Sequence, residues 1–506
     1  MSTTLDIGRA PNAIPTGTTA VEIAGLTSDS RAVEPGFLFA ALPGTKADGA
    51  QFIGEAAERG AAAILVQDGV AAPAGLAIPV VTDPTPRRRF ALMAAAFYGV
   101  QPETVVAVTG TSGKSSTVSF ARQLWSLLGD KAASIGTLGV ESDPITRYSG
   151  LTTADPVALH ADLAALARAG VTHAAMEASS HGLDQHRLDG VRVSAAGFTS
   201  FGRDHLDYHP TTEHYFEAKA RLFTEVLQPG GVAVLNADIP EFDRLKALAE
   251  AAGHPVLSYG YRGRHLRITR REPTPDGQTV LLDILGGRNY EIRFPLVGEF
   301  QLMNALCALG LVIAGKVDSA RIADSRIRRR REESASDAIA FAKALGQLRG
   351  VRGRLEHVGS LANGAAIYVD YAHKPDAITA VLDALRPHTT GRLVIAFGCG
   401  GDRDRGKRPL MGVIATKLAD RVIITDDNPR TEQPAAIRAE ILAAAPGAIE
   451  IGDRAEAIRT AIRELGSGDV LVVAGKGHEQ GQIVGTEARP FDDAEVARAV
   501  IAELAR

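Results

Sequence analysis

Short apolar runs rich in β-branched residues or alanine alternate with amphipathic segments along most of this chain. The runs at residues 62–66, 104–108, 173–177 and 195–201 are typical of buried strands. Residues 117–125 carry apolar side chains at helical spacing, directly after one of these strands and its turn. The alternation predicts an α/β fold.

The same alternation returns from about residue 348, with a marked regularity in the loops. Four predicted strands, at residues 366–369, 393–397, 421–425 and 470–474, each run into a glycine-rich or charged loop. This pattern is typical of a Rossmann-like sheet whose ligand site lies along one edge. Arginines in these loops could pair with a carboxylate, and Asp427 and Glu479 could hold an amine. A ligand with both groups, such as an amino acid, is indicated.

The length of 506 residues favours about three domains. We place a small N-terminal α/β domain at residues 1–100, a central α/β domain at 101–346 and a C-terminal Rossmann-like domain at 347–506. Several short strands are predicted within residues 256–300. The strongly basic stretch at residues 326–333 indicates a solvated helix or a mobile linker, because Ser, Asp and Ala flank it. A nucleic-acid patch is the less favoured alternative, since no aromatic residues interleave.

Composition narrows the class of protein. The 55 basic and 59 acidic residues give no net field that would favour nucleic acid. Two cysteines, Cys307 and Cys399, cannot form a disulfide framework, and no zinc-binding spacing occurs. We find no signal-peptide pattern near the start and no apolar run near the roughly 20 residues that span a bilayer. A soluble, cytoplasmic protein without membrane insertion is expected.

The stretch Thr109–Ser116, between a strand and a helix, carries the clearest chemistry. Glycines let backbone N–H groups approach phosphate oxygens, and a helix N-terminus favours anions. Lys114 would reach the terminal phosphates, and the Ser115 hydroxyl would bind Mg2+. The usual phosphate loop has a glycine where Val108 stands, so this loop is tighter. A plain turn with a surface lysine is the alternative, and we favour the nucleotide loop.

Four further positions combine polar chemistry with an unusual place in the pattern. Glu177 ends a predicted buried strand, where a metal ligand or a simple salt bridge would both fit. The segment Asp204–His209 holds two acids and two histidines, which leaves a metal or substrate site and a structural role equally open. Lys219 lies on an apolar helix face, so it either snorkels to solvent or is buried with altered charge or a modification. Asn304, within an apolar helix, suits a core hydrogen bond or a nucleotide contact.

Near the N-terminus, Ser28-Asp29-Ser30-Arg31 could be a ligand contact or only a capped turn. With this stretch, the ordered motifs resemble the Mur ligases, ATP-dependent amino-acid-adding enzymes of peptidoglycan synthesis, over nearly the whole chain. The tight phosphate loop fits that family. The other motifs that carry the resemblance are Glu177–Gly182, Asp204–Asp207, Tyr215–Phe223, Gly353–Glu356, Asp370–His373, Asp427–Arg430 and Gly475–Glu479.

Within the family, the chain resembles the type that extends UDP-N-acetylmuramoyl-L-alanyl-D-glutamate. The resemblance implies that ATP activates a carboxylate as an acyl phosphate, which the amine of an amino acid then attacks. It implies an N-terminal domain for the uridine nucleotide, a central ATP domain and a C-terminal domain that presents the amino acid. A monomer is expected.

The resemblance also assigns roles to individual residues. ATP binding falls to Gly110, Thr111, Ser112, Gly113, Lys114, Ser115, Ser116, Asn304 and Arg354. The nucleotide-sugar peptide falls to Leu26, Ser28, Thr152, Thr153, Ser179, Gln185 and Arg187. The amino acid falls to Arg403, Asp427, Asn428, Pro429, Arg430, Gly475 and Glu479.

The catalytic set implied by the resemblance is Lys114, Glu177, His205 and Lys219. Lys219 matches the lysine that carries a CO2-derived carbamate in these enzymes. Two Mg2+ sites follow, one served by Ser115 and Glu177, the other by His205 and the carbamate.

The form of the Asp427–Arg430 loop resembles the type specific for meso-2,6-diaminopimelate. Arg403 and Arg430 can pair with the far carboxylate of that amino acid, a group that L-lysine lacks. An L-lysine-adding enzyme is the alternative. A folylpolyglutamate synthetase-like ligase is less favoured, because it should lack the N-terminal domain and this loop. A nucleotide-switch protein would need an Asn-Lys-x-Asp motif, and the sequence has none.

Overall fold

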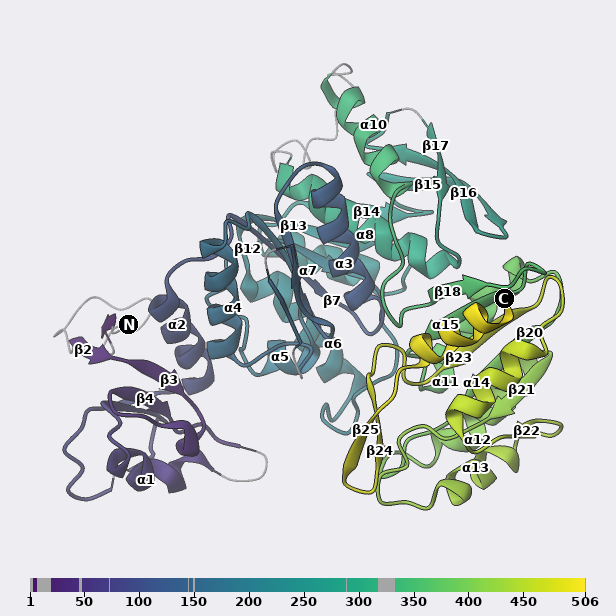
Figure 1. Ribbon diagram of the computed structural model, residues 1–506. Helices are drawn as coiled ribbons and strands as arrows, with labels where there is room; N and C mark the ends of the chain where they lie inside the picture. Colours follow the sequence, from purple (N-terminus) through teal and green to yellow (C-terminus); the bar gives the residue numbers. More distant parts are fainter. Residues whose placement is uncertain are drawn as a thin grey trace. The chain divides into compact units, whose positions relative to one another are not determined.

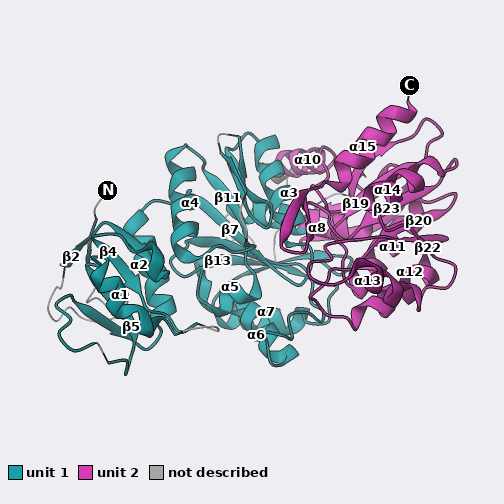
Figure 2. Ribbon diagram, turned by 60° about the horizontal axis from the view of Figure 1, so that its bottom comes forward, with its two compact units in different colours: residues 1–264, 307–329 teal, residues 265–306, 330–506 magenta. Residues whose placement is uncertain are grey.

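The fold is known from a computed structural model, drawn with its element labels in Figure 1. It describes residues 3–6, 20–44, 48–71, 73–143, 145–148, 151–287, 289–316 and 333–505. Two compact units form, residues 1–264 with 307–329 and residues 265–306 with 330–506 (Figure 2). Residues 326–332 of the basic stretch lie outside the described residues.

The first unit begins with a small parallel sheet in the order β3-β4-β5-β6. Its middle strands are almost entirely buried, which explains their continuous apolar runs. Pro86 starts α2, where a missing N–H costs nothing, and Gly99 ends it with a φ of 75°. The elements are β1 (Thr3–Asp6), β2 (Ala20–Ile23), β3 (Gly25–Thr27), η1 (Ser30–Ala32), β4 (Phe37–Ala40), η2 (Gly49–Phe52), α1 (Ile53–Glu58), β5 (Ala63–Gln67), β6 (Val80–Asp83) and α2 (Pro86–Tyr98).

A larger sheet follows in the first unit, with its strands in the order β10-β9-β8-β11-β7-β12-β13-β14. Strands β8, β11, β7, β12, β13 and β14 run parallel, so their carboxyl ends meet at one edge. The elements are β7 (Thr104–Thr109), α3 (Lys114–Leu127), β8 (Ala132–Gly136), β9 (Gly139–Ser142), β10 (Thr146–Arg147), α4 (Pro156–Arg168), β11 (His173–Glu177), α5 (Ser180–Asp184), β12 (Val193–Phe198), α6 (Thr212–Arg221), the π-helix η3 (Leu222–Val226), β13 (Leu227–Asn236), α7 (Phe242–Ala251) and β14 (Val256–Gly260).

Helix α8 (Glu299–Lys316) supplies residues to both units. The second unit opens with an antiparallel meander, β15-β16-β17, against which α10 packs. Its main sheet has the order β18-β19-β23-β20-β21-β22, parallel except for β18. The elements are β15 (Leu266–Thr274), β16 (Gly277–Ile284), β17 (Asn289–Phe294), α10 (Glu333–Leu345), β18 (Glu356–Ser360), β19 (Ala366–Asp370), α11 (Pro375–Leu385), η5 (Arg386–His388), β20 (Leu393–Phe397), α12 (Lys407–Leu418), β21 (Arg421–Ile424), α13 (Pro434–Leu442), β22 (Ile449–Glu450), α14 (Arg454–Arg463), β23 (Val470–Ala474), β24 (Gly481–Val484), β25 (Glu487–Pro490) and α15 (Asp493–Leu504).

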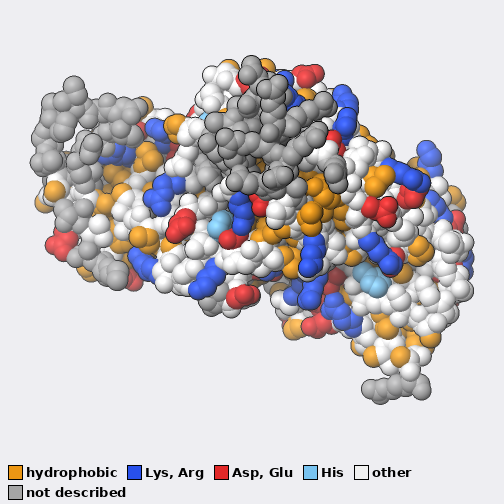
Figure 3. All heavy atoms as spheres, turned by 90° about the horizontal axis from the view of Figure 1, so that it is seen from above, with side chains coloured by type: hydrophobic (Ala, Val, Ile, Leu, Met, Phe, Trp, Pro, Cys, Tyr) orange, Lys and Arg blue, Asp and Glu red, His pale blue; other side chains and the backbone are white. Residues whose placement is uncertain are grey.

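Alternation along the strands builds a core on each face of this second sheet. In β19, Tyr368 faces one core cluster while Ile367 and Val369 face the other. On the side drawn in Figure 3, basic and acidic side chains are interspersed, as the balanced composition leads one to expect. Within the ranges given above, every helix is too short or too polar to cross a membrane.

Candidate functional site

The predicted phosphate loop joins β7 to α3 in the first unit. Gly113 is the N-cap of α3, which begins at Lys114, so the lysine stands at the helix N-terminus as the sequence indicates. The loop is held against the end of β12, because the Thr111 N–H donates to the carbonyl of Ser200 over 2.8 Å. Gly110 has a φ of 141° and Gly113 a φ of 90°, conformations that glycine adopts without strain.

Gly110→Ala is expected to destabilise the loop. A Cβ there would lie 2.0 Å from Thr199 Oγ1 and 3.1 Å from the Ser200 nitrogen, at a φ that L side chains avoid. Overpacking of this kind costs about 1–3 kcal/mol, and a displaced loop should bind ATP about tenfold more weakly. Calorimetric titration with ATP would measure the effect. Gly129→Ala is the matched control, since Gly129 has a φ of 92° but no atom within 4 Å of the added Cβ; equal effects would contradict the steric argument.

Two lysines converge on the carbonyl of Gly110. Lys114 Nζ donates to this oxygen over 2.9 Å and Lys219 Nζ over 2.8 Å. Lys219 is 1% exposed and lies 4.4 Å from the centre of the Tyr215 ring. Burial, and then the charge of Lys114, hold the pKa of Lys219 well below its usual range, while Asp204 acts in the opposite direction. The side chain is therefore buried rather than extended to solvent, and an altered charge or a modification of this lysine stays a prediction.

Glu177 lies at the carboxyl end of β11, in register with Val108 of the neighbouring strand. The carboxylate is 2% exposed, and its Oε1 accepts from the Thr137 N–H over 2.8 Å. The Thr137 hydroxyl donates to Oε2 over 3.4 Å and shares a 3.0 Å hydrogen bond with Thr152. Among the described residues Glu177 makes hydrogen bonds with Thr137 and no ion pair. A role as a metal ligand beside the phosphate loop stays a prediction.

Most of the residues expected to bind the nucleotide-sugar peptide form one connected network in the first unit. Thr153 donates to the carbonyl of Glu177 over 2.9 Å and accepts from the Ser179 N–H over 3.0 Å. Arg187 donates to the Thr153 carbonyl and to Gln185 Oε1, each over 2.7 Å. Planar guanidinium and amide groups held in this way present fixed donors to an anionic ligand.

The segment after β12 brings histidines together. His205 has a φ of 52°, and its Nε2 lies 3.4 Å from Asp204 Oδ2. Its ring packs edge-on against His181 with centroids 4.9 Å apart, and His209 and His214 share a 2.9 Å Nδ1–Nδ1 hydrogen bond. In the described part of the chain, no three His, Cys, Asp or Glu side chains are arranged to hold a metal ion. The predicted donor set differs in kind, since it includes a hydroxyl and a modified lysine.

Near the N-terminus, residues 28–31 form a capped turn. Asp29 caps η1 by accepting from the Arg31 N–H over 3.0 Å, and its carboxylate also pairs with the Arg31 guanidinium. Leu26 is buried in β3 while Ser28 is exposed. The turn thus holds Ser28 at the surface at the carboxyl end of a strand, where a ligand contact stays a prediction.

In the second unit, the loops after β21 and β23 meet. Lys476 is 0% exposed and donates to Asn428 Oδ1 over 3.0 Å and to Glu479 Oε2 over 3.1 Å. Asn428 Nδ2 donates to the same Glu479 oxygen over 2.9 Å. Asp427 lies close by, since a Cβ on Gly475 would come 2.6 Å from its Oδ2. The acids predicted to hold an amine are therefore brought to one place.

Arg430 follows these residues in a left-handed backbone conformation, with a φ of 52°. Its Nη1 donates to the carbonyls of Gly401 over 2.9 Å and Asn428 over 3.4 Å. Pro429 lies between Asn428 and Arg430, and its carbonyl lies 1.9 Å from where a Cβ on Gly401 would be. Arg403 donates to the carbonyl of its neighbour Asp402 over 3.1 Å. The lack of side chains at the glycines after β20 thus allows the Arg430 loop to pack closely against them.

The two remaining residues expected at the nucleotide, Asn304 and Arg354, belong to the second unit. Asn304 is 7% exposed within α8. The Arg354 guanidinium lies 4.7 Å from the centre of the Tyr371 ring, and burial raises the pKa of the neighbouring Asp370 to about 6. Their contact with a nucleotide stays a prediction.

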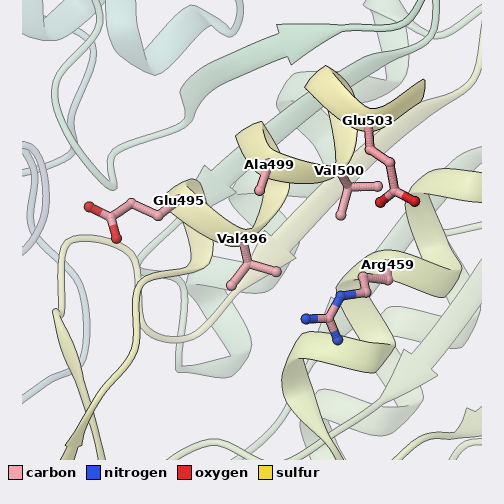
Figure 4. A pocket seen from close by; sticks show the side chains of 6 residues that line it. All are labelled: Arg459, Glu495, Val496, Ala499, Val500 and Glu503. Atoms are coloured by element: carbon pink, nitrogen blue, oxygen red, sulfur yellow. The ribbon is translucent and has the colours of Figure 1, made fainter. Parts of the chain in front are cut away.

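A separate hollow of about 430 Å³ lies along α14 and α15 (Figure 4). It is lined by Arg459, Glu495, Val496, Ala499, Val500 and Glu503. None of these residues belongs to the strand-end loops that carry the predicted chemistry. The residues with predicted chemistry therefore lie in the strand-end loops and not at this hollow.

Comparison with known proteins decides the family. Three descriptions of one family match in chain order: "Mur ligase family, catalytic domain" over residues 22–98, "Mur ligase middle domain" over 108–312, and "Mur ligase, glutamate ligase domain" over 353–477. The chain belongs to the Mur ligase family. As a Mur ligase it is an amide-forming enzyme, and the three-domain α/β fold expected from the sequence is confirmed.

Individual relatives of this Mur ligase carry one name. A Brucella melitensis protein, 54% identical over 96% of this chain and 95% of its own length, is named UDP-N-acetylmuramoyl-L-alanyl-D-glutamate--2,6-diaminopimelate ligase. A Rhizobium meliloti protein of the same name is 53% identical over 95% of this chain and 94% of its own. A solved structure titled as that ligase is 32% identical, covers all of both chains and has a TM-score of 0.71.

Sequence reasoning about this Mur ligase missed the partners that orient its site residues. Thr137, which holds both oxygens of Glu177, directly follows β8. The rule that ligands gather at strand ends could have found it. Lys476 belongs to the Gly475–Glu479 motif, and nothing in the spacing of that motif indicates that a lysine there would be fully buried.

Proposed function

We propose that this chain is a MurE-type ligase that adds meso-2,6-diaminopimelate to the D-glutamate carboxylate of UDP-N-acetylmuramoyl-L-alanyl-D-glutamate, with ATP, in peptidoglycan synthesis. The observation that carries the proposal is the 53% identity, over 95% of the chain, to a protein named for joining these two substrates. The loops around Arg430 and Glu479 support the choice of amino acid.

The work divides among three domains in this proposal. Residues 1–100 hold the uridine nucleotide through Leu26 and Ser28. Residues 101–346 hold ATP and the peptide, and residues 347–506 present the amino acid. The tertiary separation of the small sheet β3–β6 from the larger parallel sheet supports the first boundary.

The chemistry starts with two anions that repel each other, the D-glutamate carboxylate and the γ-phosphate of ATP. Lys114 at the N-terminus of α3 lowers that repulsion, and the backbone N–H groups of the loop orient the phosphates. Transfer of the phosphoryl group gives an acyl phosphate and ADP. The neutral amine of diaminopimelate then attacks the acyl carbon and loses a proton, and the tetrahedral intermediate expels phosphate to leave the amide.

Lys219 is the proposed carbamate. Its lowered pKa increases the share of neutral amine, which is the form that attacks CO2. The nitrogen lone pair forms an N–C bond as one C=O π bond of CO2 breaks, and its electron pair moves to oxygen to give the carboxylate. The nitrogen then releases a proton. The carbamate would also place a negative charge near Lys114, so that attraction replaces the repulsion that a second ammonium group at the Gly110 carbonyl would cause.

Mg2+ suits the donor set that the proposal provides. Ser115, Glu177 and the Lys219 carbamate offer the hard oxygen ligands that this ion prefers, and His205 would complete the second of two sites. Glu177 is already fixed by two hydrogen bonds from Thr137. When bound, Mg2+ would screen the phosphate charges that the carboxylate must approach.

The proposed binding of the amino acid in the second unit follows from the charges of its groups. Arg430 and Arg403 would pair with the far carboxylate of diaminopimelate, while Asp427 and Glu479 would hold its ammonium group. The contacts from Asn428 and Lys476 to Glu479 Oε2 fix that carboxylate before a ligand arrives.

The test is ATP-dependent phosphate release in the presence of the muramoyl dipeptide nucleotide and either meso-diaminopimelate or L-lysine. Release with diaminopimelate, together with a product whose mass fits the added residue, supports the proposal. Equal or faster release with L-lysine would show the lysine-adding type. Release with neither amino acid would contradict the ligase assignment for these substrates.

A further inference from the structure

Arg454 is a fully buried cation to which none of the motifs above assigns a role. It is the first residue of α14, and its side chain is 0% exposed. Its Nε donates to Asp493 Oδ1 over 2.7 Å and its Nη2 to Asp493 Oδ2 over 2.6 Å. Asp493 begins α15 and is also fully buried. The pair therefore links two helices inside the second unit.

The other hydrogen bonds of this guanidinium reach the loops that carry the proposed amino-acid contacts. Nη1 donates to the carbonyl of Asp426 over 3.2 Å, and Nη2 donates to the carbonyl of Ala474 over 3.0 Å. Each carbonyl belongs to the peptide bond that precedes a proposed contact residue, Asp427 or Gly475. One planar group thus holds the backbone of both loops where β21 and β23 end.

The strand order explains why such a link is needed. Strands β21 and β23 are not neighbours, because β20 lies between them. No ladder hydrogen bond can therefore set the separation of their terminal loops. A guanidinium, whose donors are fixed in one plane, spans the gap at a defined width.

We infer that Arg454, held by Asp493, is a positioning residue that sets the distance between the Asp427–Arg430 loop and the Gly475–Glu479 loop and so shapes the diaminopimelate site. The inference rests on the proposed function. It predicts that loss of the link weakens diaminopimelate binding more than it affects ATP or the chemical step, because both loops belong to the amino-acid end.

Arg454→Lys is the first test, in the full chain. A single ammonium keeps the charge but cannot serve the carboxylate and both carbonyls at once. We expect KM for meso-diaminopimelate to rise roughly 10- to 100-fold, the effect of a misplaced binding group, while KM for ATP and kcat at saturating amino acid stay within about threefold. Arg463→Lys is the matched control, since Arg463 joins the same two helices through an exposed 3.1 Å contact to Glu503.

A second variant separates positioning from folding. In Arg454→Met/Asp493→Leu both buried charges are gone, and replacing a buried ion pair by apolar groups is often neutral for stability. We expect thermal unfolding near that of the wild type with KM for diaminopimelate still raised. A double variant with wild-type KM would overturn the inference and leave a structural ion pair. Wild-type enzyme that shows no turnover with diaminopimelate would instead contradict the proposed function, and this inference with it.

Discussion

Lys219→Ala is expected to lower kcat about a thousandfold, at the upper end of the loss seen when one preorganised electrostatic group is removed from a site where charge develops. The side chain is 1% exposed and lies against the phosphate loop through the Gly110 carbonyl. Alanine would remove both the amine and the carbamate that we propose it carries. The KM for the amino acid should change little, because the contacts proposed for it lie in the other unit.

The carbamate itself is tested by rescue. Acetate or formate added to Lys219→Ala should restore part of the activity, because a small carboxylate can occupy the space that the carbamate leaves. Wild-type enzyme prepared with isotope-labelled CO2 should carry the label at this lysine by mass spectrometry. Full activity of the alanine variant without added acid would refute the carbamate.

Lys246→Ala provides the matched control for this experiment. Lys246 is a half-exposed lysine of α7 in the same unit, and its Nζ lies 3.9 Å from Glu250 across one helical turn. Surface pairs of this kind contribute little to stability. Its replacement should leave kcat unchanged, so that a loss in both variants would point to general damage.

Arg430→Ala is expected to abolish most of the discrimination between meso-diaminopimelate and L-lysine. The wild type should favour diaminopimelate by a kcat/KM ratio of about 10⁴, because a site built for a buried polar group rejects the analogue that lacks it. Losing the arginine should lower kcat/KM for diaminopimelate roughly 10²–10³-fold, as truncation of one partner of a buried charge pair does, while kcat/KM for L-lysine changes little.

The hydrogen bonds of the Arg430 guanidinium support a role for this side chain in binding the far carboxylate of diaminopimelate. Among the described residues, Nη1 makes the hydrogen bonds of this side chain, to Gly401 and Asn428. That leaves Nε and Nη2 to form a bidentate pair with a ligand carboxylate. Competition assays with both amino acids in one mixture would measure the ratio directly.

Arg489→Ala is the control for Arg430→Ala. Arg489 lies on β25, in the hairpin beside the Arg430 loop, with a 59% exposed side chain that pairs with Glu487. An unchanged ratio is expected for it. If Arg430→Ala keeps the wild-type preference, another residue selects the amino acid.

The sequence predicted many of the buried strands and the charged or glycine-rich loops that follow them, but not every element, as the hairpin β24–β25 shows. Apolar runs with glycine-rich ends gave β7, β11 and the second parallel sheet, because burial on both faces leaves a continuous apolar signal. Contacts between residues that are distant in the sequence could not be predicted. Periodicity identifies which face of α6 is buried, but it cannot show that Lys219 reaches the carbonyl that Lys114 also uses. For the same reason, the sequence does not show that Thr137 hydrogen-bonds Glu177, or that Arg454 hydrogen-bonds the backbone of two loops.

The hairpin β24–β25 has a consequence for redesign of the amino-acid preference. The Arg430 N–H donates to the Ile483 carbonyl over 3.1 Å, and the Gly485 N–H donates to the Arg430 carbonyl over 2.7 Å. Asn428 Oδ1 accepts from the Ile483 N–H, and Gln482 donates to the Asp427 carbonyl. The loop and the hairpin therefore form one hydrogen-bonded unit. A loop transplanted from a relative of different preference would lose these hydrogen bonds unless residues 481–490 are exchanged together with it.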